Sequence, residues 1–182
     1  ASYYVDHFKL DLQSAGLAAG SFGLLALFAR ALGGIVSDRF AHKKGLDART
    51  SLLFALMLGE GLGLLWFARS DTTSLAVIAM IVFGMFTHMA CGATYALVPF
   101  IDRKALGGVA GIIGAGGNVG AVLAGFLLKA VADVQQCFSI LGGIVVAGSL
   151  CAIAVRFSAE HKANEEELYL RALAARDMVP AE

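Results

Sequence analysis

The chain has 182 residues, of which 58% are hydrophobic and 15% are charged, and its formal net charge is zero. A soluble domain of this length is usually about 45–50% apolar and about 25% charged. The mean hydropathy of +0.76 arises from several separate apolar runs, each near the roughly 20 residues that cross a bilayer. The composition excludes an ordinary soluble domain and predicts an all-α, polytopic membrane protein.

Cysteine usage and the first residues add two expectations. Cys91, Cys137 and Cys151 are odd in number, lie inside apolar runs and form no CxxC pair, which predicts buried, reduced thiols. The first residues show no signal-peptide pattern. Residues 1–4, ASYY, look like the tail of a preceding apolar segment. We therefore expect a piece of a longer protein.

In chain order, the sequence divides into a lead-in, a membrane region and a tail. Residues 1–13 mix charged and aromatic side chains and form a short connection. The membrane region, 14–157, contains five apolar spans at residues 14–36, 50–68, 73–100, 105–131 and 137–155. Residues 158–182 form a polar tail with the charge spacing of a solvated amphipathic helix. We expect this tail to be cytosolic and partly disordered, with a regulatory tail as the alternative.

The basic residues predict the orientation, because Lys and Arg concentrate in short cytoplasmic loops of membrane proteins. The connections after the first and third spans and the start of the tail carry Arg39, Lys43, Lys44, Arg49, Arg103, Lys104 and Arg156. The alternate connections carry Lys9, Arg69 and Lys129. The pattern predicts a multi-pass protein of the cell (inner or plasma) membrane with a cytoplasmic C-terminus.

The fourth span contains a glycine-rich stretch, residues 107–125, which reads GGVAGIIGAGGNVGAVLAG. Glycine inside a helix costs about 1 kcal/mol relative to alanine, so this density needs a compensating role. Small residues let membrane helices approach closely, and glycine lets a backbone approach a ligand. One helical face carries Gly107, Gly111, Gly114, Asn118, Ala121 and Gly125. The Asn118 amide serves either helix packing or ligand contact, and a dinucleotide loop at 116–120 is disfavoured between membrane spans.

Arg30 is the one charged residue well inside the first span. A membrane-embedded arginine costs several kcal/mol at mid-depth, so it normally faces a cavity, a partner or a ligand. Snorkelling to the cytoplasmic interface is the alternative. A guanidinium offers a planar fork of donors that suits a small oxyanion and keeps its charge at physiological pH. We predict a role for Arg30 in anion binding or in a buried pair.

Two more ionisable residues lie at membrane depth, Glu60 in the second span and His88 in the third. Either side chain could relay protons, because ionisable groups inside membrane spans often mark ion pathways. A structural hydrogen bond inside the helix bundle is the alternative for each of them. The residues alone do not decide between these two roles.

A block of glycine and charge follows the first span, in which Gly34 precedes Asp38 and Arg39. The glycine allows a close helix approach. Asp38 is placed to form an ion pair or to cap the N-terminus of a neighbouring helix. Such a contact would hold one conformation closed on the cytoplasmic side, and a plain membrane-edge charge cluster is the alternative.

This block resembles the loop motif G-x-x-x-D-R-x-G of the major facilitator superfamily. Gly34, Asp38 and Arg39 match the motif, Lys43 continues its basic part, and Ala41 stands where the motif has glycine. That departure leaves the shape of the turn open.

Three other segments resemble the nitrate/nitrite porter family within that superfamily. GAGGNVG at residues 114–120 is similar to the nitrate signature of the family, and FARALGG around Arg30 is similar to the segment with its substrate arginine in helix eight. ACGATYALVPF at residues 90–100 is similar to helix ten of assimilatory members. The matches cover most of residues 1–157 in the expected order.

The resemblance implies the C-terminal half of a twelve-helix major facilitator bundle, with the end of helix seven in residues 1–13 and then helices eight to twelve. In that family one arginine from each half clamps the anion. Arg30 would be the arginine of this half, and the substrate contacts would also include Gly114, Gly116, Gly117 and Asn118. The implied partners are nitrate or nitrite, protons, the lipid bilayer and the N-terminal half of the same transporter. No cofactor, metal or nucleic acid is implied.

The function that follows is secondary active transport of nitrate, with nitrite as a second substrate, by alternating access. Proton-coupled uptake for nitrate assimilation is favoured by the resemblance. Nitrate/nitrite exchange, transport of another small anion and a transporter-like sensor remain alternatives. An enzyme is not expected, because the sequence offers no nucleophile–base pair and no metal-ligand cluster.

Overall fold

The computed structural model describes residues 1–177, apart from the side chains of residues 169, 172, 173 and 175–177. In this part all regular structure is helical, and the elements are α1 (Ser2–Phe8), α2 (Leu12–Lys44), α3 (Asp47–Ala68), α4 (Thr73–Ile101), α5 (Leu106–Ala130), α6 (Val134–Ala154) and α7 (Ala159–Asp177). Helices α2 to α6 are each long and apolar enough to cross a membrane. The predicted all-α class and the five predicted spans are confirmed.

Residues 1–13, expected from their composition to be a connection and from the resemblance to hold the end of a helix, contain a helix and a short connection. Helix α1 occupies most of this segment and ends at Lys9, which has a left-handed backbone (φ 56°). Asp11 then caps α2, because its carboxylate accepts a hydrogen bond of 2.9 Å from the Ser14 amide. This side-chain cap is typical of a helix start.

The first predicted span is too short at its C-terminal end. Helix α2 does not end at residue 36 but continues through Asp38 and Arg39 to Lys44. The basic residues in its last turn interact favourably with the negative end of the helix dipole. Gly45, with a φ of 76°, ends the helix, and α3 begins two residues later. The charged block is therefore helical rather than part of a loop.

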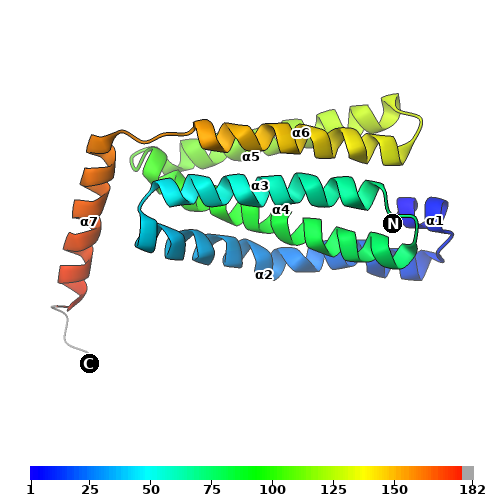
Figure 1. Cartoon of the computed structure of the whole chain (residues 1–182), viewed down its shortest axis with the longest axis horizontal. Coiled ribbons are helices and arrows are strands. Elements are labelled where there is room, and N and C mark those ends of the chain that lie inside the picture. Colours follow the sequence, from blue (N-terminus) through cyan, green and yellow to red (C-terminus); the bar gives the residue numbers. More distant parts are fainter. Residues whose placement is uncertain (178–182) are drawn as a thin grey trace.

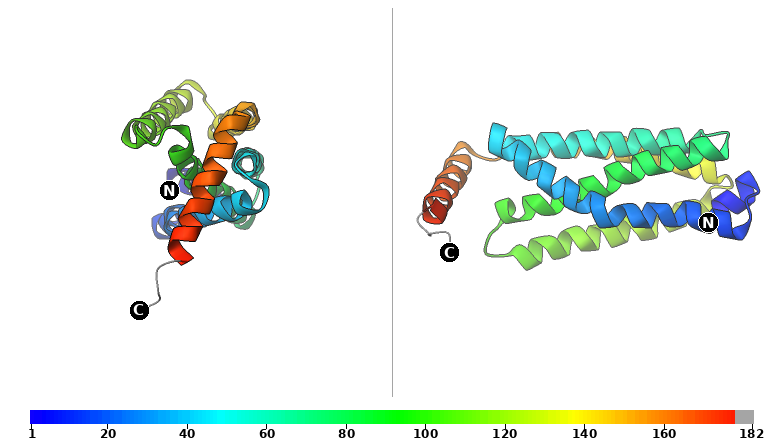
Figure 2. Two further views of the ribbon diagram at one scale, coloured as in Figure 1. Left: turned by 90° about the vertical axis from the view of Figure 1, so that its left-hand side faces the viewer. Right: turned by 90° about the horizontal axis from the view of Figure 1, so that it is seen from below.

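The long helices lie side by side, with α1 at one end of the bundle and α7 across the other (Figure 1). The extensive contacts are those of α2 with α4, of α3 with α4 and of α3 with α6. Helix α5 packs lightly against α4 and α6 and stands at the edge of the bundle when it is viewed end-on (Figure 2). No residue of α5 is buried.

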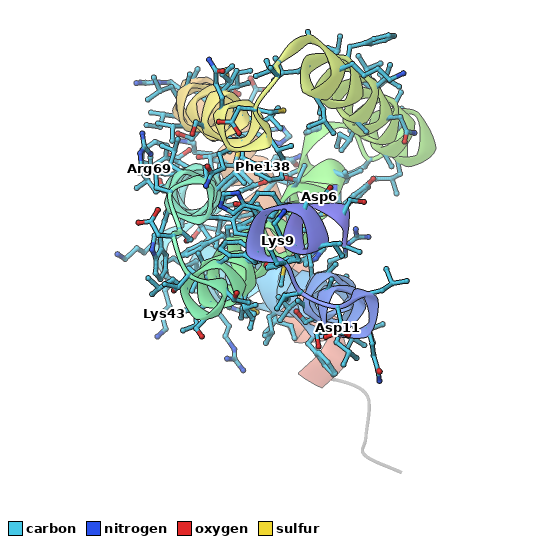
Figure 3. All side chains as sticks on the ribbon, turned by 90° about the vertical axis from the view of Figure 1, so that its right-hand side faces the viewer. Asp6, Lys9, Asp11, Lys43, Arg69 and Phe138 are labelled. Atoms are coloured by element: carbon cyan, nitrogen blue, oxygen red, sulfur yellow. The ribbon has the colours of Figure 1, made fainter. Side chains whose placement is uncertain are left out.

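An aromatic cluster holds α1 onto the bundle. The Tyr3 ring lies 5.3 Å from the rings of Phe67 on α3 and Phe138 on α6, measured between centroids. Tyr4 is buried in the same cluster with Met80 of α4. Figure 3 views this end, where Phe138 is labelled beside α1. Aromatic pairs at such separations are stabilising, so α1 is anchored by three different helices.

Helix α7 is tied to the ends of α3 and α4 by polar contacts. Arg103 forms a two-pronged ion pair with Glu165, which is buried, and Lys162 pairs with Asp47. The carboxylate of Glu165 raises the pKa of Arg103 by hydrogen bonding to its guanidinium. The tail is helical at residues 159–177 and is docked on the bundle end rather than only solvated, and residues 178–182 lie outside the described part.

Candidate functional site

Arg30 lies at the margin of the face with which α2 contacts α4. Ala29, Gly33 and Ser37 occupy one helical face and are buried, whereas Arg30 beside them is exposed. Within residues 1–177 the guanidinium of Arg30 makes no hydrogen bond and no ion pair. An arginine inside an apolar span normally faces a cavity, a partner or a ligand, and the described residues supply no counter-charge for Arg30.

The backbone of Arg30 is in direct contact with α4. A Cβ atom on Gly92 would lie 2.9 Å from the carbonyl carbon of Arg30 and closer still to its oxygen. A Cβ atom on Gly33 would lie 2.7 Å from the carbonyl carbon of Met89. Real Cβ atoms essentially never come within 3.0 Å of such neighbours. Glycine is therefore required where the two backbones touch, as in other closely packed membrane helices.

The predicted contacts on α5 lie apart from this crossing. Asn118 is exposed and makes no hydrogen bond with the described residues. Gly116 and Gly117 have open space where a Cβ would be, and the nearest atom to a Cβ on Gly114 is the Tyr95 hydroxyl at 3.8 Å. Helix α4 contacts both α2 and α5. The structure does not bring Asn118 and Arg30 into contact.

The charged block on α2 forms a cluster with the start of α3 and the end of α4. The Arg49 guanidinium donates to Asp38 Oδ1 at 2.7 Å and to Ser37 Oγ at 3.1 Å, and it stacks 4.5 Å from the Phe100 ring centroid. The Arg49 side chain is 8% exposed, whereas that of Asp38 is 63% exposed. This Asp38–Arg49 cluster links three helices and leaves most of the Asp38 carboxylate accessible.

Gly34 and Arg39, which the sequence groups with Asp38 in a predicted contact on the cytoplasmic side, have a smaller share in the cluster. Arg39 is exposed and makes no ion pair with the described residues. A Cβ on Gly34 would have the Gly92 carbonyl oxygen as its nearest neighbour, at 4.0 Å. The sequence placed Arg49 only among the loop charges. Its pairing with Asp38 had no signal in the spacing, because the turn at Gly45 decides which residue returns to face Asp38.

Glu60 and His88 both contact a neighbouring helix. Glu60 of α3 interacts with the side chain of Thr87 on α4. The Nε2 atom of His88 lies 3.0 Å from the Phe22 carbonyl oxygen of α2, and the two rings pack at 4.8 Å. His88 therefore has the kind of structural bond that was the alternative to proton relay, whereas Glu60 has only its contact with Thr87 among the described residues. In the described part no hydrogen bond joins Glu60 to His88.

The described residues contain no candidate metal site, and their cysteines form no disulfide. No group of three or more His, Cys, Asp or Glu side chains comes together in residues 1–177 in a way that could hold a metal ion. Cys91, Cys137 and Cys151 are free thiols, but the predicted burial holds for one of them. Only Cys137 is fully buried, whereas Cys151 is exposed on α6.

Comparison with known proteins identifies the family. The family model described as the Major Facilitator Superfamily matches residues 1–176. "High affinity nitrate transporter 2.5" of Arabidopsis thaliana is 43% identical over 123 residues, which are 68% of this chain and 24% of the relative. "Nitrate/nitrite transporter NrtP" of Nostoc punctiforme is 31% identical over 157 residues, covering 86% of this chain and 30% of the relative. No solved structure matches.

Another relative, "High affinity nitrate transporter 2.7" of Arabidopsis thaliana, is 33% identical over 159 residues, or 86% of this chain and 32% of the relative. The chain thus spans between a quarter and a third of the length of these relatives. The predicted resemblance to nitrate/nitrite porters is confirmed by these matches. Five apolar helices and a family match over nearly the whole chain lead to one conclusion: the chain belongs to the major facilitator superfamily.

Proposed function

We propose that this chain is the C-terminal half of a transporter that moves nitrate, with nitrite as a second substrate. The observation that carries the proposal is Arg30, an arginine inside an apolar span without a counter-charge among the described residues. A guanidinium binds a planar oxyanion through charge-assisted, two-pronged hydrogen bonds. The names of the relatives, which are nitrate and nitrate/nitrite transporters, support nitrate as that anion.

The anion would lie between two halves of the transporter, with Arg30 from this half and a second arginine from the other. Helix α5 supports this arrangement, because most glycines of its glycine-rich stretch have open space where a Cβ would be and the Asn118 amide makes no hydrogen bond within the described bundle. Asn118 and the backbone at Gly114, Gly116 and Gly117 would contact the anion or the opposite half. Rocking of the two halves would then expose the site to each side in turn.

The Asp38–Arg49 cluster would stabilise the conformation closed at the cytoplasmic side. The largely accessible Asp38 carboxylate can accept hydrogen bonds from a helix N-terminus of the other half. Gly34 would allow that helix to approach, and Arg39 would add a surface charge. The basic connections lie at the same end of the bundle as α7 (Figure 1), which supports a cytoplasmic C-terminus in the cell membrane.

The energy coupling is proposed to be proton symport for nitrate assimilation, with Glu60 and His88 as the candidate relay. His88 already has a structural bond to the Phe22 carbonyl oxygen of α2, so proton transfer through it would require this bond to rearrange. Nitrate/nitrite exchange is the competing mechanism. Nitrate-evoked currents in proteoliposomes, with and without internal nitrite, separate the two, and uptake without any pH dependence contradicts symport.

The proposal is tested by Arg30→Lys in the full-length protein. Lysine keeps the charge but loses the fork of donors, so we expect nitrate uptake into proteoliposomes to fall by at least about tenfold. Arg69→Lys is the matched control, because the Arg69 guanidinium only bonds the Leu65 carbonyl of its own helix. Near-normal nitrate uptake by Arg30→Lys would refute the role of Arg30. Competition of nitrate with chloride, formate and nitrite tests the alternative of another small anion.

A further inference from the structure

We infer that Gly92 of α4 is a positioning residue for Arg30, and that the backbone contact between them sets where the guanidinium stands in the anion path. This inference rests on the proposed function, because it assumes that Arg30 meets the substrate. Gly92 lies outside the glycine-rich stretch of α5 and on a different helix from Arg30.

The contact between α2 and α4 is reciprocal. Gly92 of α4 faces the Arg30 carbonyl of α2, and Gly33 of α2 faces the Met89 carbonyl of α4. Each helix therefore contributes one glycine and one carbonyl group. Two backbone contacts one turn apart fix both the spacing and the relative rotation of the helices at the level of Arg30. No side chain lies between them that could adjust.

A methyl group at Gly92 cannot be accommodated by a rotamer change. Its neighbours would be the Arg30 carbonyl group, at 2.9 Å from the carbon, and the Gly34 nitrogen, at 3.1 Å. All of these are backbone atoms of α2, so the helix itself has to move away from α4. Because the obstructing carbonyl belongs to Arg30, the displacement acts on the same residue that carries the guanidinium.

Small displacements matter for a site that recognises a small ion. Binding groups have to be held within about 0.5 Å of the productive geometry, and a shift of about 1 Å caused by a distant mutation can cost roughly 100-fold in a catalytic site. Charge-assisted hydrogen bonds depend on donor direction as well as distance. Moving the backbone of Arg30 therefore weakens anion binding and alters the preference among anions of different shape.

Gly61 provides a matched control for tight glycine packing. A Cβ on Gly61 would lie 2.7 Å from Cγ2 of Val146, 2.8 Å from the Val146 nitrogen and 2.9 Å from the Gly142 oxygen. This contact also includes backbone atoms of both helices, but it joins α3 to α6 and does not involve Arg30. Gly61→Ala thus reports the general cost of separating two helices, whereas Gly92→Ala adds the displacement of Arg30.

The test measures KM and the maximal rate of nitrate and nitrite uptake by the full-length protein in proteoliposomes. The Tm of each variant is measured alongside. We expect Gly92→Ala to raise KM for nitrate by about tenfold and to change the nitrate-to-nitrite KM ratio, with a smaller change in maximal rate. Gly61→Ala should lower Tm and leave both KM values within about twofold. A nitrate KM for Gly92→Ala within twofold of the parent, or an equal rise for Gly61→Ala, overturns the inference.

A milder variant keeps the inference testable if Gly92→Ala does not reach the membrane. Gly84→Ala adds a methyl group between the same two helices, but this methyl meets side-chain atoms of α2, those of Phe22 at 2.9 Å and Leu25 at 3.1 Å, rather than its backbone. We then expect a rise in KM of about two- to threefold, and an unchanged KM contradicts the positioning role. Normal uptake by Arg30→Lys would refute the proposed function, whereas an inactive Arg30→Lys with a normal Gly92→Ala refutes only the inference.

Discussion

At the crossing of α2 and α4, glycine lets two backbones touch, whereas along α5 glycine touches almost nothing that the structure describes. Gly33 and Gly92 each lie against a carbonyl group of the opposite helix. On α5, by contrast, Gly107, Gly111 and Gly120 have no described atom near the position of a Cβ. Glycine therefore lies in a helix–helix contact at the α2–α4 crossing, but on an open face along α5. Glycine density by itself therefore does not locate close packing.

The largest expected effect comes from filling the completed contact. Gly33→Ala places a methyl group 2.7 Å from the carbonyl carbon of Met89. Overpacking of a well-packed contact costs about 1–3 kcal/mol, so we expect the Tm of the full-length protein to fall by several degrees. Gly120→Ala on α5 is the control with open space. An equal fall in Tm for Gly120→Ala would show that α5 is packed as tightly in the whole protein and would break the comparison.

The second effect tests whether the open face of α5 binds a ligand. Asn118→Ala removes the one amide on that face, and the loss of a hydrogen bond to a charged ligand is worth about 1.5–3 kcal/mol. We expect the Kd for nitrate, measured by titration calorimetry on the full-length protein, to rise by about tenfold or more. A lowered Tm with an unchanged Kd would instead assign Asn118 to packing between helices.

A smaller effect is expected at the connection just before α5. Arg103→Gln removes the cation that pairs with the buried carboxylate of Glu165, so α7 should detach from the bundle end. Limited proteolysis should then cut residues 159–177 at least several times faster. Arg171→Gln is the control, because its partner Glu167 lies on α7 itself. Equal proteolysis of the parent and both variants would mean that this ion pair does not hold the tail.

The smallest effect concerns the start of α2, far from its crossing with α4. Hydrogen bonds from Ser14 lower the pKa of Asp11 from its ordinary value of 3.8. A lowered pKa means that the folded state favours the ionised carboxylate. The ionised Asp11 carboxylate therefore stabilises the fold above about pH 4, and this stabilisation is lost as the pH falls through the lowered pKa. Hydrogen exchange in the first turn of α2 should therefore speed up selectively below about pH 4, and Asp11→Ala should remove this pH dependence.

Much of the fold follows directly from the sequence. Five apolar runs of suitable length predict five spanning helices, because a bilayer requires about 20 apolar residues per crossing. The end of α2 could not be predicted in the same way. Residues after position 36 become polar, which predicts an exit from the membrane, but polar residues near an interface can continue a helix. Only Gly45, with its positive φ, ends it.

The residues proposed for the candidate site stand out in the sequence, but their arrangement does not. Arg30 stands out because a charge in an apolar span is costly. Gly92 does not stand out, since one glycine in a long helix has many explanations and its neighbour on α2 is 62 positions earlier in the chain. The one feature of the sequence that could have pointed to Gly92 is the cost of a glycine inside a helix, about 1 kcal/mol. The contact of Arg49 with Phe100 likewise depends on how three helix ends meet.

The light packing of α5 also bears on the order in which the bundle assembles in the bilayer. Helices α2, α3, α4 and α6 are joined by backbone-to-backbone contacts and extensive packing, so these four can associate soon after insertion. Lipid tails solvate the apolar side chains of α5 as well as protein does, but they offer no hydrogen bond to the Asn118 amide. Helix α5 should therefore be the last span to find its place, and a polar neighbour for that amide is what would retain it.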